Sequence, residues 1–469
     1  MSGIAPRPLS RTAARGSSAA PVRILHLGLG NFFRAHQAWY THHAADAAEW
    51  GIAAFTGRHP GLARTLAAQD GLYTLVVRGA EGDRNEVIRS LSAAHPSADH
   101  AAWLDYWRLP GLRIVTLTIT EAGYARVQGT DGDGRNRRGS LDTARTDVSA
   151  DIAALKASSG ANVTTAPAKL LAGLAARREA GLPPVVIVPC DNLPGNAEVA
   201  RRVVRDLAEA VADPGLTAAA EGSLFATTMV DRITPAATKA DLDMASSAGG
   251  FADFAPVVTE PFSEWVLSGR FPAGRPRWED AGARFVPDVL PFERRKLWLL
   301  NGAHSLFAYT APLLGHATVA EAAADPRCRE WLGQWWQEAS RHLSLPIAEL
   351  TAYQDELLRR WANPRIRHTL AQIAADGSQK LPVRILPALR AERAAGRLPH
   401  GATHILSGWL LHLRGRGAPM QDAGADRALA EGPLPEAARR VLAFLDPPLA
   451  DDAELTAAVI AHARALERL

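Results

Sequence analysis

Lys296, Asn301 and His304 lie in the stretch ERRKLWLLNGAHS at residues 293–305, around the apolar run Leu297–Leu300. Because an α-helix turns about 100° per residue, Asn301 would lie about 140° from Lys296, with His304 between them at about 80°. All three side chains could therefore face one cavity of a mostly buried helix. Burial lowers the pKa of a lysine enough for it to act as a general base, and an amide can hold an alcohol or carbonyl oxygen. The alternative interpretation is a surface lysine, a capping asparagine and a packed histidine.

A second candidate site follows the first apolar strand, Val22–Leu27, in the glycine turn GLGNFFRAH. A helix from about Phe33 to Ala47 would complete the strand, turn and helix of a dinucleotide-binding unit. Gly28 would allow the tight turn, and Gly30 the close approach of a pyrophosphate to the helix N-terminus. The candidate cofactor-binding residues of this turn are Gly28, Gly30, Asn31 and Phe32. Phe33 replaces the third glycine of the common fingerprint, so an ordinary strand–helix turn is the alternative.

The second apolar strand, Trp50–Phe55, ends in Thr56-Gly57-Arg58-His59, without the acid that usually binds the adenosine ribose. Arg58 could contact a 2′-phosphate or stack on adenine. It could equally be a solvated turn arginine. The sequence of this strand end therefore leaves NAD and NADP both open.

Two further apolar strands also end in polar residues. Leu112–Ile119 is followed by Thr120 and Glu121, and Pro184–Val188 leads into PCDNLPGN, which contains Asn192. Ligands bind at the carboxyl ends of the strands in parallel sheets. Thr120 and Glu121 are therefore candidates to flank a nicotinamide or substrate, and Asn192 is a candidate donor to a reacting oxygen. A capping threonine that opens a turn is the alternative for Thr120.

Composition places the chain among globular proteins of two to four domains. It has 469 residues, of which 47% are hydrophobic and 22% charged, and a net charge of +3. No basic block indicates nucleic-acid binding, and no apolar run approaches the roughly 18 residues of a membrane span. Cys190 and Cys328 are the only cysteines, which is typical of a reducing, cytoplasmic setting. They form no zinc pattern, so we expect alcohol chemistry without a metal.

Six motifs occur along the chain, from the glycine turn to a polar cluster in the helical C-terminal half. They are GLGNFFRAH (28–36), TITEAGY (118–124), PCDNLPGN (189–196), TMVDRITP (228–235), KLWLLNGAHS (296–305) and NPRIRHTLAQIAADGSQKLP (363–382). Their order and sequences resemble the mannitol dehydrogenase family, the zinc-independent polyol dehydrogenases and reductases. The resemblance covers nearly the whole chain after the first 21 residues.

The resemblance implies an α/β fold in two domains. Residues 22–285 would form a Rossmann-type NAD-binding domain with insertions, and residues 286–469 a mainly α-helical substrate and catalytic domain. The active site would lie in the cleft between them. Residues 1–21, rich in Ser, Ala, Arg and Pro, are expected to form a disordered tail.

The resemblance also implies the catalytic roles. Lys296 matches the family's catalytic lysine, and Asn192 and Asn301 match the asparagines that hold the reacting oxygen. His304 matches the histidine that positions the substrate. In oxidation, neutral Lys296 would accept the hydroxyl proton while hydride moves to the nicotinamide, and the asparagines would stabilise the developing alkoxide.

Several positions bear on the substrate. Asp231 and Lys380 match polar positions of the substrate pocket, and Glu293 matches a glutamate implicated in proton exit. Gln372 departs from the arginine of mannitol-oxidising members, and its surroundings look more like the fructuronate reductase branch. Lys380 and Arg384 are available for a substrate carboxylate.

We therefore expect an NAD(P)-dependent oxidoreductase acting on a small molecule, either D-mannonate/D-fructuronate or D-mannitol/D-fructose. NAD is favoured by the resemblance, and NADP is not excluded. A mannitol-1-phosphate 5-dehydrogenase is a further alternative. A non-catalytic dinucleotide-binding sensor on the same fold is another, although a sensor has no need for a base.

Overall fold

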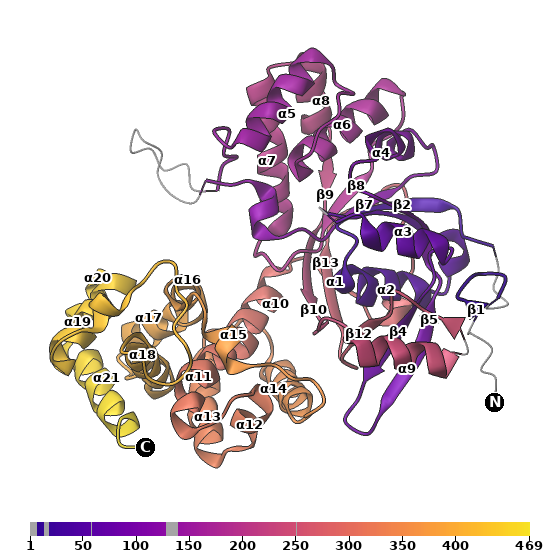
Figure 1. Cartoon of the computed structure of the whole chain (residues 1–469). Helices are drawn as coiled ribbons and strands as arrows, with labels where there is room; N and C mark the ends of the chain where they lie inside the picture. The colour runs from indigo at the N-terminus through magenta and orange to yellow at the C-terminus, as the bar shows by residue number, and fades with distance from the viewer. Residues whose placement is uncertain (1–6, 14–17, 58, 128–138, 250) are drawn as a thin grey trace. The chain divides into compact units, whose positions relative to one another are not determined.

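The computed structural model describes residues 7–13, 18–57, 59–127, 139–249 and 251–469 (Figure 1). The chain divides into two compact units, Met1–Val289 and Leu290–Leu469. The division falls four residues after the boundary expected between residues 285 and 286. The first unit is α/β and the second is helical, so the expected fold class is confirmed.

A six-stranded parallel sheet organises the first unit. Its strands are β2 (Val22–Leu27), β3 (Gly51–Phe55), β6 (Leu91–His95), β7 (Ile114–Leu117), β8 (Val186–Pro189) and β9 (Leu224–Phe225). Their spatial order is β6-β3-β2-β7-β8-β9, and every neighbouring pair is parallel. In order of appearance this is the 3-2-1-4-5-6 arrangement of the Rossmann fold, whose order reverses between β2 and β7.

Alternate strand residues of the sheet enter two different cores. Leu25 and Val115 pack with residues of α4 (His100–Trp107), α6 (Ala166–Glu179) and α7 (Asn196–Val211). Their neighbours Ile24 and Ile114 pack with residues of the helices that follow β2 and β3. Because both faces are covered, the strands consist almost entirely of apolar residues.

Three smaller sheets complete the first unit (Figure 1). One joins β12 (Val257–Thr259), β4 (Tyr73–Arg78) and β5 (Asp83–Ile88), another joins β10 (Thr227–Asp231), β13 (Glu264–Ser268) and β14 (Arg284–Phe285), and the third pairs β1 (Arg7–Pro8) with β11 (Phe251–Ala252). Strands β4 and β5 pair antiparallel as a hairpin.

Residues 7–13 differ from the disordered tail that we expected. Besides forming β1, this segment contains Leu9, which is buried with only 1% of its surface exposed. The Arg11 guanidinium donates to the carbonyls of Arg89 and Leu91 at 2.9 and 2.8 Å. The buried Leu9 and the Arg11 side chain, which donates to two backbone carbonyls, tie this segment to the first unit. Composition alone does not reveal these contacts.

The second unit is built around a buried helix, α11 (Gly302–Thr310), whose nine residues are all buried. It packs against α12, α13, α15, α16 and α18. The helices of this unit are α10 (Leu290–Arg295), α12 (Val319–Ala324), α13 (Pro326–Ser340), α14 (Ile347–Trp361), α15 (Leu370–Ala374), α16 (Gly377–Arg384), α17 (Leu386–Ala394), α18 (His400–Leu413), α19 (Leu434–Leu445), α20 (Pro447–Ala450) and α21 (Ala453–Leu466). None of the helices in the described part of the chain has the length and hydropathy needed to cross a bilayer.

Candidate active site

The glycine turn after β2 has the tight geometry that a dinucleotide-binding turn requires. Gly28 has φ +113°, and the amides of Gly28 and Leu29 both donate to the Phe55 carbonyl, at 2.9 and 2.8 Å. A Cβ on Gly28 would lie 2.1 Å from the Thr118 carbonyl oxygen, whereas a Cβ on Gly30 would meet only the Gly28 oxygen at 3.5 Å. The fold therefore demands glycine at position 28, while it leaves open space beside Gly30.

The helix after this turn is shorter than the sequence predicts. Instead of one helix from about Phe33 to Ala47, the chain forms α1 (Asn31–Ala35) and α2 (Gln37–His43). The break falls at His36, which has φ −120° and ψ −89° and whose Nε2 contacts the Glu264 carbonyl at 3.0 Å. A tertiary contact thus interrupts a segment whose local sequence is helical.

Asn31 and Phe32 have partners within the turn itself. The Asn31 Oδ1 accepts from Nη2 of the buried Arg34 at 2.7 Å, and Phe32 stacks on His36 with ring centroids 5.0 Å apart. Both side chains are half-buried. Asn31 and Phe32 therefore have a structural role in the turn, in addition to the cofactor contact expected of them.

The residues at the end of β7 are exposed. Thr120 precedes a short 3₁₀ turn, Glu121–Tyr124, and the Glu121 carboxylate forms an ion pair with Arg126 at 2.6 Å. Arg58, the other candidate cofactor residue, lies outside the described residues.

A buried carboxylate beside Asn192 joins the ends of β7 and β8. Asp191 accepts hydrogen bonds from the Ile119 amide at 2.5 Å and from the Tyr124 hydroxyl. Burial raises the pKa of Asp191 to about 7. The two hydrogen bonds lower that pKa, but by less than burial raises it. Asn192 is the exposed residue next to this anchor. Asp191 and Tyr124 were not among the site residues predicted from the sequence, although both lie in the polar motifs that follow β8 and β7.

The motif after β8 is also fixed to β10, which carries Asp231 at its carboxyl end. The Asn196 amide donates to the Thr228 carbonyl at 2.9 Å, and the Thr228 hydroxyl donates to the Pro189 carbonyl at 2.7 Å. Asp231 is the last residue of β10 and is buried. Polar side chains therefore attach the carboxyl end of β8 to the start of β10.

Lys296 and Asn301 lie in a π-helix, η4 (Lys296–Asn301), placed between α10 and α11. The Gly302 amide donates to the Leu297 carbonyl, five residues earlier. Because such bonds place residues five apart one above the other, Lys296 and Asn301 lie on the same side of the helix. The angle of about 140° that α-helical geometry predicts for them is therefore wrong.

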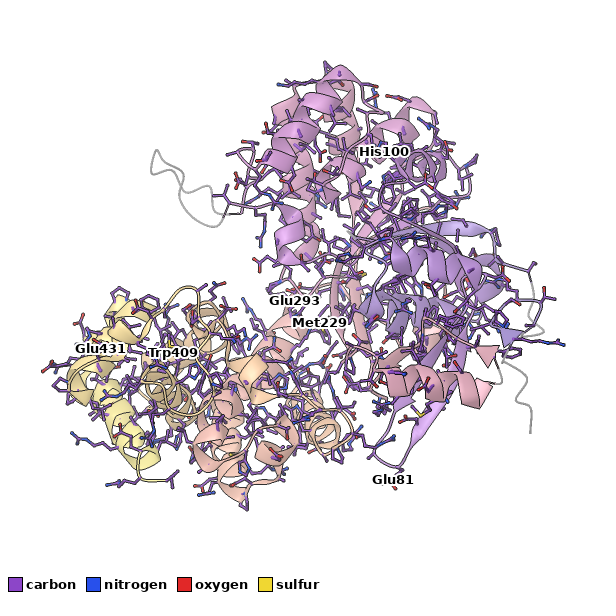
Figure 2. The ribbon with its side chains drawn as sticks, viewed as in Figure 1. Glu81, His100, Met229, Glu293, Trp409 and Glu431 are labelled. Carbon is purple, nitrogen blue, oxygen red and sulfur yellow. The ribbon has the colours of Figure 1, made fainter. Side chains whose placement is uncertain are left out.

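His304 and Glu293 lie on either side of this π-turn. His304 belongs to α11, is buried, and packs edge-on against His368 with ring centroids 5.0 Å apart. Glu293 lies in α10, three residues before Lys296, and is half-buried (Figure 2).

The candidate substrate residues of the second unit differ in their surroundings. Gln372 is exposed on α15. The Lys380 ammonium donates to the carbonyls of Ile373 and Ala375 at 3.1 and 2.5 Å, and so caps the end of α15. Lys380 thus has a structural role that its position in the sequence did not predict.

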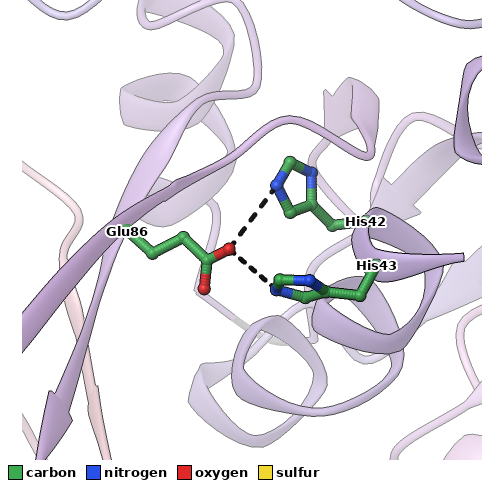
Figure 3. Close-up of side chains that lie close together, drawn as sticks. All are labelled: His42, His43 and Glu86. Atoms are coloured by element: carbon green, nitrogen blue, oxygen red, sulfur yellow. Dashed lines mark ion pairs between the residues drawn. The ribbon is translucent and has the colours of Figure 1, made fainter. Parts of the chain in front are cut away.

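One side-chain cluster in the first unit has the composition of a metal site: His42, His43 and Glu86 (Figure 3). His43 Nε2 and His42 Nε2 lie 2.7 and 3.7 Å from one Glu86 oxygen. The Arg89 amide donates to His42 Nδ1 at 3.4 Å, so the proton of neutral His42 is on Nε2 and faces Glu86. That nitrogen has no lone pair for a cation, and we assign the cluster as a polar contact between α2 and β5.

The Rossmann sheet with its glycine turn, followed by a helical unit with a lysine and an asparagine on one face, defines an oxidoreductase with a dinucleotide-binding domain. Residues 22–280 match the domain described as the mannitol dehydrogenase Rossmann domain, and residues 288–441 match the mannitol dehydrogenase C-terminal domain. The chain belongs to the mannitol dehydrogenase family, whose members are oxidoreductases that act on CH–OH groups.

Three comparisons illustrate this membership. The chain is 38% identical to D-mannonate oxidoreductase of Escherichia coli, over 84% of this chain and 80% of that protein. It is 36% identical to mannitol 2-dehydrogenase of Cereibacter sphaeroides, over 86% of this chain and 83% of that protein. The solved structure of Pseudomonas fluorescens mannitol 2-dehydrogenase, a ternary complex with NAD and D-mannitol, has a TM-score of 0.75 and 29% identity, covering 99% of this chain and 95% of that one.

Proposed function

We propose that the protein interconverts D-mannonate and D-fructuronate with NAD, using Lys296 as general base and acid. The family membership supports the reaction class, and the relative named D-mannonate oxidoreductase supports the aldonate. The observation that carries the choice of an aldonate over a neutral polyol is the environment of Arg384.

Arg384 is a mostly buried cation beside the π-turn. Its Nη1 lies 3.4 Å from the Asn301 carbonyl oxygen and 3.3 Å from the Ser305 hydroxyl. Burial lowers the pKa of Arg384 to about 10, and among the described residues no carboxylate pairs with it. Buried guanidinium groups normally have an anionic partner, and the planar guanidinium matches a carboxylate in two hydrogen bonds.

Two neighbouring cations do not offer the same opportunity. Arg295 is buried next to Lys296 but pairs with Glu349 at 3.4 Å and lies 4.0 Å over the Tyr353 ring. Lys380 has two backbone acceptors of its own. Arg384 is therefore the residue of this helical unit that we assign to the substrate carboxylate.

The chemistry assigned to the remaining residues follows from their types. Lys296 would accept the proton of the substrate hydroxyl during oxidation and return a proton to the carbonyl oxygen during reduction. The amides of Asn301 and Asn192 would donate hydrogen bonds to that oxygen as its negative charge develops, and His304 would orient the neighbouring hydroxyl. When bound, NAD supplies the hydride acceptor. The open space beside Gly30 fits a pyrophosphate that approaches the backbone.

The second candidate is the pair D-mannitol and D-fructose. It is supported by the similarity to mannitol 2-dehydrogenases, one of them solved with NAD and D-mannitol. The exposed Gln372 would then replace, without loss of activity, the arginine that mannitol-oxidising members often have. The assays use both NAD and NADP, because Arg58 lies outside the described residues and does not distinguish the two cofactors.

The test combines a substrate panel with Arg384→Met. Initial rates are measured by NADH absorbance with mannonate, fructuronate, mannitol, fructose and mannitol 1-phosphate, with each cofactor. A lost pair of charge-assisted hydrogen bonds costs about 1.5–3 kcal/mol, so kcat/KM for mannonate should fall about 10- to 150-fold. The mannonate-to-mannitol ratio of kcat/KM should fall by the same factor. An equal loss on both substrates would show that Arg384 only supports the fold, and turnover confined to mannitol would favour the second candidate.

A further inference from the structure

The π-turn that aligns Lys296 and Asn301 leaves a backbone carbonyl without its regular partner. The Gly302 amide donates to the Leu297 carbonyl, and the α-helical ladder resumes in α11. With α-helical spacing the next amide, that of Ala303, would pair with the carbonyl four residues earlier, at Leu299. Regular spacing then assigns no amide to the Trp298 carbonyl. A skipped carbonyl in a buried helix needs another donor.

Two adjacent tryptophans of α13 supply donors at this step of the ladder. The indole N–H of Trp335 donates to the Trp298 carbonyl at 2.8 Å, and that of Trp336 donates to the Leu299 carbonyl at 2.9 Å. The first bond satisfies the carbonyl that the π-turn orphans. In a continuous α-helix the Gly302 amide would occupy the Trp298 carbonyl, so the Trp335 indole N–H favours the π-helix. The Trp336 bond attaches the neighbouring Leu299 carbonyl to the same helix, α13.

Gly302 makes room for this contact. A Cβ there would lie 2.6 Å from the Trp335 indole nitrogen and 2.8 Å from two of its ring carbons. The Trp335 ring lies against the backbone of Gly302, so a residue with a side chain does not fit at this position.

The helix that carries both tryptophans is itself fixed from the other side. The Glu338 carboxylate of α13 accepts hydrogen bonds from the amides of Gly401 and Ala402 at the start of α18, at 2.7 and 2.9 Å. A Cβ on Gly401 would lie 2.3 Å from the Trp335 backbone nitrogen, so α13 and α18 are in close backbone contact. The indole donors are thus held on a rigid helix.

From these contacts we infer that Trp335 and Trp336 are positioning residues for the reaction. Their indole N–H groups hold residues 296–301 in the π-helix, and the π-helix places the Lys296 base and the Asn301 amide on one side. Neither tryptophan is assigned contact with substrate. The inference rests on the proposed roles of Lys296 and Asn301.

The test compares Trp335→Phe and Trp336→Phe with Trp409→Phe. Trp409 is fully buried in α18 of the same unit, and its indole nitrogen has no hydrogen-bond partner among the described residues (Figure 2). All three variants lose ring volume, and only the first two lose a hydrogen bond to the π-turn. Trp336 lines a surface cavity of about 350 Å³, whereas Trp335 is fully buried. Replacing Trp336 should therefore disturb folding less than replacing Trp335.

The measurements are kcat and its pH profile, the dissociation constant for NADH, and hydrogen–deuterium exchange of the peptide covering residues 295–305. We expect kcat to fall about tenfold or more in Trp335→Phe, the order set by one unsatisfied buried carbonyl. In Trp336→Phe we expect a smaller fall in kcat, because the Leu299 carbonyl keeps its backbone donor. The pH profile should shift, NADH binding should stay within twofold, and exchange should quicken in that peptide. Trp409→Phe should lower thermal stability without these changes.

The outcomes separate the two proposals. If all three variants lose activity only in proportion to their loss of stability, with unchanged pH profiles and exchange at residues 295–305, the positioning role is refuted. If the wild-type protein turns over no substrate of the panel, the proposed function fails, and hydrogen exchange alone still decides whether the tryptophans hold the π-turn.

Discussion

Replacing Gly28 and replacing Gly30 by alanine should have opposite consequences, although the two glycines are two residues apart. At Gly28 the backbone has φ +113°, and the new Cβ would lie 2.1 Å from the Thr118 carbonyl oxygen. At Gly30 φ is −141°, and the new Cβ would have one neighbour, 3.5 Å away. The fold therefore resists the first change and tolerates the second.

The magnitude for Gly28→Ala follows from two terms. A left-handed backbone conformation costs an alanine about 1–2 kcal/mol, and forcing an extra carbon into a packed site costs about 1–3 kcal/mol. The sum is about 2–5 kcal/mol of unfolding free energy, which would lower the Tm of a unit of this size by about 4–20 °C. The Thr118 hydroxyl donates to the Gly28 carbonyl at 2.8 Å, so the damage would reach the end of β7.

For Gly30→Ala we expect a Tm within about 2 °C of the wild type. If a pyrophosphate approaches the backbone here, the added methyl group would be overpacked in the complex by about 1–3 kcal/mol, and the dissociation constant for NADH would rise about 5- to 150-fold. The two quantities are measured by thermal unfolding and by NADH fluorescence titration. Unchanged NADH affinity in Gly30→Ala would refute the cofactor assignment of this turn, and an unchanged Tm in Gly28→Ala would refute the strain argument.

Two further predictions concern the second unit. Lys296→Ala should remove most turnover and leave NADH binding nearly intact, because the base is lost and the glycine turn is not; normal turnover in this variant would contradict the proposed mechanism. Burial first, and then the neighbours His462 and His400, lower the pKa of His404 from its ordinary 6.5 to about 3. Between these two values the unfolded state binds more protons, so the protein should lose about 1.4 kcal/mol of stability through this residue for each pH unit below 6.5. His404→Gln should make the pH dependence of urea unfolding less steep by that amount, and an identical slope in both proteins would disprove the linkage.

The architecture of the first unit could be predicted from local patterns. Short apolar runs followed by glycines or polar residues indicated β2, β3, β7 and β8, since strands buried on both faces carry mostly apolar side chains. The polar motifs at their carboxyl ends indicated where a ligand would bind. The parallel strand order confirms the predicted sheet, and the motif resemblance identified the family that the comparisons confirm.

Other features depend on contacts between residues far apart in the chain. The break at His36 depends on the Glu264 carbonyl, more than 200 residues away, and no helix propensity encodes it. The capping role of Lys380 and the position of Asp191 between two strand ends likewise appear only when the chain is folded. The segment 7–13 looked disordered by composition because its partners, among them Asp70 and the Leu91 carbonyl, are distant in sequence.

The stretch from Lys296 to Asn301 shows most clearly which features depend on local sequence and which depend on distant contacts. Its sequence by itself determined that a lysine and an amide would share a buried helix, because residue type and apolar spacing are local properties. Whether that helix is α or π was decided by Trp335 and Trp336, which donate to the Trp298 and Leu299 carbonyls from another helix. Both helical forms satisfy the local sequence, and they differ in which carbonyl lacks a backbone partner. Only the tertiary structure supplies a donor to that carbonyl, and so it decides which residues face one another.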